Sequence, residues 1–158
     1  PKFIALSLSE EINEKSKSHK IMTNVGAYIR MSNFIETKKY INNIYKSLRK
    51  FSPKIEIIFT VSPVPIDTVI GIRDQLNMSA IEIDCVSKST LRIALNEFLL
   101  SEEILKDKFL HYLPSYEIVR WIAPLIGIPV FGKEDASSRH VSNIILNSVC
   151  DFVYYQKN

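Results

Sequence analysis

The sequence predicts a single α/β domain with a mostly parallel sheet, and two observations carry this prediction. Apolar runs of strand length alternate along the chain with segments of helical period, which is the pattern of a layered α/β fold. No internal repeat, low-complexity tract or linker interrupts this alternation. The length of 158 residues suits one domain, and an apolar share of 46% is enough to form its core.

The expected elements follow one another in order. Strands are predicted at residues 3–8, 55–61, 80–84, 109–113 and 128–131. Helices are predicted at residues 33–51, from a cap at Ser87 or Ser89 to residue 99, at 117–126, and from just past His140 to Phe152. The polar stretch at residues 10–20 has no apolar period and is expected to be a loop or short helix.

The first helix has the clearest boundaries. Asn33 and Glu36 have the spacing of a capping pair, and Pro53 prevents the helix from continuing far beyond Phe51. Prolines also end the two central strands, at Pro63 and at Pro114.

Composition argues against several classes of function. The 20 Lys and Arg residues are scattered and nearly balanced by 17 Asp and Glu, so nucleic acid is not an expected partner. Cys85 and Cys150 are far apart and lack metal-ligand spacing, which predicts no metal site and a reducing, cytoplasmic location. No apolar run is long enough to cross a membrane, and no glycine-rich loop suggests a nucleotide cofactor, so we expect neither a membrane partner nor a cofactor.

Polar residues follow the predicted strands, where open parallel sheets bind their ligands. These candidate substrate-binding residues are Ser9, Glu10, Ser62, Ser87, Lys88, Ser115, Tyr116 and Glu117. A structural interpretation stays open for each, because serines often cap helices, tyrosines are often buried, and a glutamate suits the first turn of a helix.

His140 is the candidate catalytic base. The positive end of the following helix dipole favours a neutral imidazole, and Asp135 could hold that ring in the required tautomer. Alternatively, His140 caps the helix and Asp135 forms a turn.

Four segments in this order resemble successive motifs of the GSCFA family, a bacterial branch of the SGNH-hydrolase-like fold. They are Thr60-Val61-Ser62-Pro63-Val64-Pro65, Ser87-Lys88-Ser89-Thr90-Leu91-Arg92, Tyr112-Leu113-Pro114-Ser115-Tyr116-Glu117-Ile118-Val119 and Arg139-His140-Val141. The resemblance covers most of the chain and implies a three-layer, SGNH/flavodoxin-like sandwich. It also implies a serine esterase or acyltransferase that acts on an ester or acyl group of a small molecule or carbohydrate, in bacterial polysaccharide metabolism.

Two departures from the family pattern stand out. The sequence contains no Gly-Ser-Cys-Phe-Ala string, the motif whose serine corresponds to the SGNH nucleophile. We therefore expect the chain to be the C-terminal portion of the domain, without its first βα unit and nucleophile. Ser137 also stands three residues before His140, where the SGNH pattern has an aspartate. The alternative function is thus a non-catalytic carbohydrate-binding or assembly module that kept the fold without a complete triad.

Overall fold

The computed structural model describes residues 31–66, 78–132 and 139–155. Its elements, in chain order, are α2 (Phe34–Phe51), β1 (Ile57–Phe59), α4 (Ala80–Leu99), the 3₁₀ turn η1 (Ile104–Lys106), β2 (Leu110–Tyr112), α5 (Ser115–Glu117), the π-helical turn η2 (Ile118–Ile122), α6 (Ala123–Leu125) and α7 (Asn143–Tyr155). The strand predicted at residues 3–8 and the loop at 10–20 lie outside the described residues.

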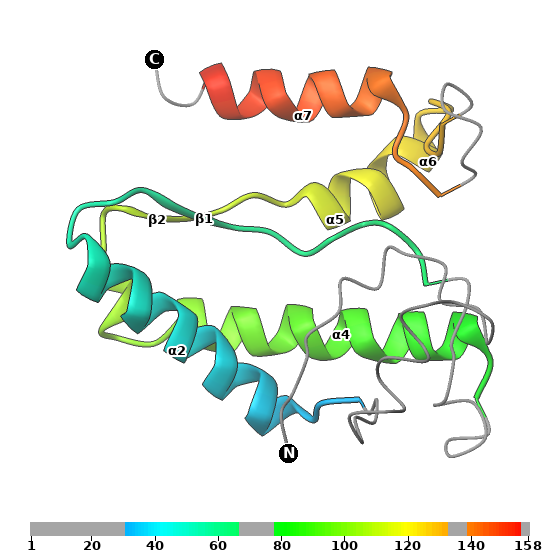
Figure 1. Cartoon of the computed structure of the whole chain (residues 1–158). Helices are drawn as coiled ribbons and strands as arrows, with labels where there is room; N and C mark the ends of the chain where they lie inside the picture. Colours follow the sequence, from blue (N-terminus) through cyan, green and yellow to red (C-terminus); the bar gives the residue numbers. More distant parts are fainter. Residues whose placement is uncertain (1–30, 67–77, 133–138, 156–158) are drawn as a thin grey trace, which may run out of the picture.

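The sheet confirms the predicted parallel pairing. Within the described residues it has two strands, β1 and β2, which pair in parallel with Ile57 opposite Leu110 and Phe59 opposite Tyr112. The chain leaves both strands in the same direction, and α2 and α4 lie on one side of them while α7 lies on the other (Figure 1). The carboxyl ends of the two strands therefore meet at one edge, which is the arrangement that positions a ligand site.

A first hydrophobic core joins α2, α4 and the strands. Its buried residues are Ile41, Tyr45, Ile57, Val61, Ala94, Leu95, Phe98 and Ile104. The ring of Phe98 meets the rings of Tyr45 and Phe59 edge-on, with centroids 5.4 Å and 5.8 Å apart. Such contacts stabilise aromatic cores beyond the area that they bury.

A second core lies between α7 and the segment of η2 and α6. It consists of the buried residues Val119, Ala123, Val141 and Ile145, so among its described members none comes from β1 or β2. The helices and the parallel pair of strands show the α/β character of the fold, whereas a complete three-layer sandwich stays a prediction.

Helix α2 has the boundaries that the sequence predicts. The Asn33 side chain accepts a hydrogen bond from the Glu36 backbone N–H at 3.0 Å, and the Glu36 carboxylate accepts one from the Asn33 N–H at 3.2 Å. This reciprocal pair satisfies two of the orphan donors at the helix start. At the other end, Ser52 is the C-cap of the helix, and Pro53 follows it.

The strand predicted at residues 80–84 is wrong, because this segment is the first turn of α4. Ser79 and Glu82 form a capping box: the Glu82 carboxylate accepts from the Ser79 N–H at 2.7 Å, and the Ser79 hydroxyl accepts from the Glu82 N–H at 3.3 Å. The alternation of Ile81 and Ile83 is too short to distinguish a strand from a helix. Ser87 and Ser89, expected as caps, consequently lie inside α4.

The predicted helix at residues 117–126 begins earlier and changes pitch. It starts at Ser115, passes through the π-helical turn and ends at Leu125 of α6. Gly127, just beyond the cap, has a φ of 71°, the left-handed conformation that glycine favours. The Gly127 N–H donates to Pro124 O and the Ile128 N–H to Ala123 O, both at 3.3 Å, which is the Schellman pattern of helix ends. In place of the edge strand predicted at 128–131, Phe131 makes a single antiparallel bridge to Val141.

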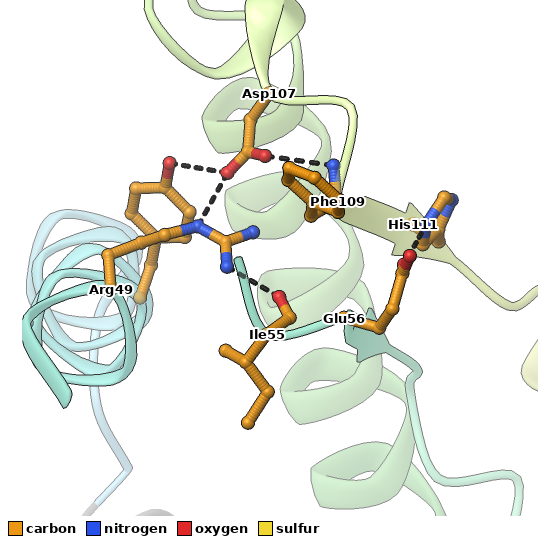
Figure 2. Close-up of polar contacts among 7 residues, drawn as sticks. Arg49, Ile55, Glu56, Asp107, Phe109 and His111 are labelled. Atoms are coloured by element: carbon orange, nitrogen blue, oxygen red, sulfur yellow. Dashed lines mark hydrogen bonds and ion pairs between the residues drawn. The ribbon is translucent and has the colours of Figure 1, made fainter. Parts of the chain in front are cut away.

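A mostly buried ion pair between Arg49 and Asp107 fastens α2 to the turn before β2 (Figure 2). The Asp107 carboxylate accepts hydrogen bonds from the Tyr45 hydroxyl at 2.7 Å, the Arg49 Nε at 2.7 Å and the Phe109 N–H at 2.9 Å. Arg49 also donates to the carbonyl of Ile55, just before β1. These bonds fix the position of the helix relative to both strands.

Candidate functional site at the carboxyl ends of the strands

The ends of β1 and β2 are joined through the side chain of Ser115. Its hydroxyl is hydrogen-bonded to the Thr60 hydroxyl and donates to the carbonyl of Val61 at 3.2 Å. Thr60 and Val61 directly follow β1, and Ser115 begins α5 after β2. The predicted site residue Ser115 therefore lies where the sequence places it, and its hydroxyl has partners within the fold.

A polar cluster of Asp84, Lys88 and Arg120 lies beside this edge and ties three segments together. Asp84, on α4, accepts a hydrogen bond from the Ile66 N–H at 2.9 Å through Oδ1 and from Arg120 Nη2 at 2.7 Å through Oδ2. Arg120, on η2, donates from Nε to the carbonyl of Pro63 at 2.7 Å. The ion pair is mostly buried, with side-chain exposures of 12% for Asp84 and 24% for Arg120. It therefore sets the path of the chain after β1.

Lys88 lies one turn beyond Asp84 on the same face of α4 and is 7% exposed. Burial lowers the pKa of the Lys88 amine, and the charge of Arg120 lowers it further, while the Asp84 carboxylate acts in the opposite direction. Lys88 thus shares a helix face with Asp84, whose carboxylate is paired with Arg120. An amine in this environment can bind an anion or act in proton transfer.

Tyr116 lies in the same region and is partly buried against the first core. Burial is the main cause that raises the pKa of its hydroxyl; the charge of Arg120 opposes this, and that of Asp84 adds to it. Tyr116 thus remains a protonated hydrogen-bonding group near neutral pH.

Glu117 is held in a separate ion pair. It accepts from Arg92 Nε at 2.5 Å and from the Tyr112 hydroxyl at 2.9 Å and 2.7 Å, and the Arg92 guanidinium lies 4.7 Å from the centre of the Tyr112 ring. Burial opposes ionisation, but the bonds from Arg92 and Tyr112 outweigh it and lower the pKa of Glu117. This carboxylate connects α4 to β2 and α5, so the structure gives it a structural role beside the predicted one.

His140 is exposed and lies three residues before Asn143, the first residue of α7. Its carbonyl accepts a hydrogen bond from the Gly132 N–H at 2.6 Å, next to the bridge between Phe131 and Val141. The Arg120 guanidinium lies 5.9 Å from the centre of the Phe131 ring. Phe131 thus contacts both Val141, next to His140, and Arg120 of the polar cluster. These contacts connect the segment before α7 to the cluster.

The remaining predicted residues separate into two groups. Ser9, Glu10 and Asp135 lie outside the described residues, so the Asp135–His140 pair stays a prediction. Ser62 accepts from the Val64 N–H at 3.4 Å in the chain after β1. Ser87 donates to the Asp84 carbonyl at 3.1 Å inside α4, so it does not follow a strand.

Sequence reasoning missed Asp84 and Arg120, the ion pair of the polar cluster. Asp84 and Lys88 have the i, i+4 spacing of side chains that share a helix face, a signal that is visible only once the segment is interpreted as helical. Arg120 has no local signal, because it reaches the cluster by long-range folding.

The described residues hold neither a metal-ligand cluster nor a membrane-spanning helix. No group of three or more His, Cys, Asp or Glu side chains there could hold a metal ion. No helix within 31–66, 78–132 and 139–155 has both the length and the apolar character needed to cross a membrane.

The chain belongs to the GSCFA family, whose sequence model matches residues 12–150. Comparison with curated proteins and with solved structures finds no match. The family assignment confirms the resemblance of the four motifs, three of which contribute residues to the edge described above.

Proposed function

We propose that this GSCFA protein is an SGNH-type hydrolase or acyltransferase whose acyl substrate, an ester of a small molecule or carbohydrate, binds over the carboxyl ends of β1 and β2. The observation that carries the proposal is the mostly buried Asp84–Arg120 ion pair, with buried Lys88 one turn further along α4, beside the strand ends joined by Ser115. Buried charges cost free energy, and open parallel sheets bind ligands at this edge. The π-helical turn that carries Arg120 adds support, because such turns are frequent at functional sites.

In this proposal His140 is the general base. The nucleophile is the serine of the Gly-Ser-Cys-Phe-Ala motif, a string that the 158 residues do not contain. Its oxygen attacks the acyl carbon while His140 takes the hydroxyl proton and Asp135 orients the ring. His140 then returns that proton to the departing alkoxide, and water or an acceptor alcohol releases the acyl group from the serine. Ser62, Ser115 and Tyr116 would line the acyl or sugar pocket.

Replacing His140 by alanine in the intact protein tests this role. We expect turnover of a generic acyl ester such as p-nitrophenyl acetate to fall by about a thousandfold, because the proton acceptor is lost. Melting should change little, since the side chain is exposed. His111→Ala is the matched control, because His111 is an exposed histidine on β2, paired with Glu56; it should keep full activity. Equal activity of His140→Ala and wild type would remove His140 from the mechanism.

The second candidate function is carbohydrate binding without catalysis. It is favoured by Ser137, which stands where the SGNH pattern has its aspartate. Saturable binding of a carbohydrate by the intact protein, together with no turnover of any acyl ester, would support this function and contradict the enzyme.

A further inference from the structure

The polar cluster carries an excess of positive charge. Asp84 is its single anion, whereas Lys88 and Arg120 are both cations. Both carboxylate oxygens of Asp84 already have partners, namely the Ile66 N–H and Arg120 Nη2. The ion pair with Arg120 therefore neutralises Asp84, and the charge of Lys88 is left over.

Two donors of the cluster have no partner in the part of the chain that the structure describes. The Lys88 amine makes no hydrogen bond or ion pair there, although the residue is only 7% exposed. Arg120 uses Nε and Nη2 but not Nη1. Neither donor is among the completely enclosed side-chain atoms that lack a partner in the described residues, so both reach solvent. Cationic donors that reach solvent beside the strand ends and have no partner there are available to an anionic group.

The chemistry of the missing group follows from the charge. A monoanion would bring the cluster to neutrality, whereas a phosphate, which carries a charge of about −1.5 to −2 near pH 7, would leave it negative. A carboxylate has two oxygens that can accept from an ammonium and a guanidinium at once.

We propose that Lys88 Nζ and Arg120 Nη1 bind a carboxylate of the substrate, so that the protein acts on an acidic molecule such as a uronic acid ester. This inference rests on the proposed function, for which it names the substrate class. The carboxylate would lie at the carboxyl ends of β1 and β2 and hold the acyl group relative to His140.

A binding titration of the intact protein tests the inference without requiring turnover. D-glucuronate is compared with D-glucose, which lacks the carboxylate, and with inorganic phosphate, at constant ionic strength. The NMR signal of Arg120 Nε–H is followed. Glucuronate should shift this signal saturably, glucose should not, and phosphate should bind more weakly. Lys88→Met should weaken glucuronate binding at least about tenfold, because it removes a charge-assisted hydrogen bond. Lys46→Met, at an exposed lysine of α2, should leave the affinity unchanged.

Thermal unfolding separates ligand binding from a structural role of Lys88. If the amine is held for a ligand, Lys88→Met should melt no lower than wild type in the absence of glucuronate, since the variant removes a charge that has no partner in the fold from a mostly buried residue. A lower melting temperature would show that Lys88 is a structural counter-ion and would overturn the inference. Equal binding of glucose, tighter binding of phosphate, or unchanged affinity in Lys88→Met would overturn it too. If the wild-type protein binds glucuronate but turns over no ester, the proposed function is contradicted while the inference about binding stands.

Discussion

Replacing Phe98 by alanine should lower the free energy of unfolding by about 3–5 kcal/mol, the cost of removing a large buried ring. Phe98 is 3% exposed in the first core. Its ring contacts those of Tyr45 and Phe59, so the change leaves a cavity between α2, α4 and β1. Urea unfolding of the intact protein, followed by circular dichroism, measures the change.

Phe51→Ala is the matched control. Phe51 ends α2 and is 84% exposed, so its removal should change the free energy of unfolding by less than about 0.5 kcal/mol. Phe98→Leu retains most of the buried volume and should give an intermediate loss. Similar losses for Phe98→Ala and Phe51→Ala would contradict the packing of α4 against α2 and β1.

The second large effect is expected from Asp107→Asn. This change should lower the free energy of unfolding by about 3 kcal/mol, because the Arg49 guanidinium loses its compensating charge. The side chains of Arg49 and Asp107 are 15% and 10% exposed, so solvent replaces the carboxylate poorly. Glu56→Gln is the control with the same change of chemistry. Glu56 pairs with His111 at the surface, where both side chains are more than 40% exposed, and such pairs contribute about 0–1 kcal/mol (Figure 2).

The loss of unfolding free energy in Asp107→Asn should depend on pH. Burial opposes ionisation of Asp107, but the hydrogen bonds from Tyr45, the Phe109 N–H and Arg49, with the charge of Arg49, lower its pKa below the ordinary value. A carboxylate of this kind stabilises the fold fully above the unfolded-state pKa of about 3.9, and this contribution is lost as pH falls through the lower folded-state pKa. The gap in stability between wild type and Asp107→Asn should therefore narrow below about pH 4. A gap that is constant from neutral to acidic pH would contradict the ion pair.

The elements that the sequence predicts correctly have strong local signals. Helix α2 has an amphipathic period, a capping pair at Asn33 and a proline beyond its end. The two strands are apolar runs ended by proline, and their parallel pairing follows from the helix between them. Helix α7 begins just beyond His140, as its apolar stripe predicts.

The errors come from short segments and from long-range contacts. Five alternating residues at 80–84 favour a strand, but the capping box of Ser79 and Glu82 begins a helix there. In place of the predicted edge strand there is a single antiparallel bridge, which pairs Phe131 with Val141, ten positions further along the chain. The apolar periodicity of the sequence does not reveal pairings between segments that are distant along the chain.

The candidate site likewise contains residues that the sequence identifies and residues that only the tertiary structure reveals. Ser115 and Tyr116 could be chosen from sequence because their motif follows a strand, and Ser115 joins the strand ends. Lys88 is selected only through the strand predicted at 80–84, which is helical instead. Asp84 and Arg120 are separated by 36 positions and meet only through the tertiary fold. The excess charge of the polar cluster is consequently a property that the structure alone displays.

The central claim is that His140 and the polar cluster of Asp84, Lys88 and Arg120 serve a single ligand site. It is tested most directly by following the imidazole signals of His140 and the Nε–H signal of Arg120 in one glucuronate titration of the isotope-labelled intact protein. The account predicts that both sets of signals shift with the same dissociation constant. An unchanged His140 ring at saturation of Arg120 would contradict it.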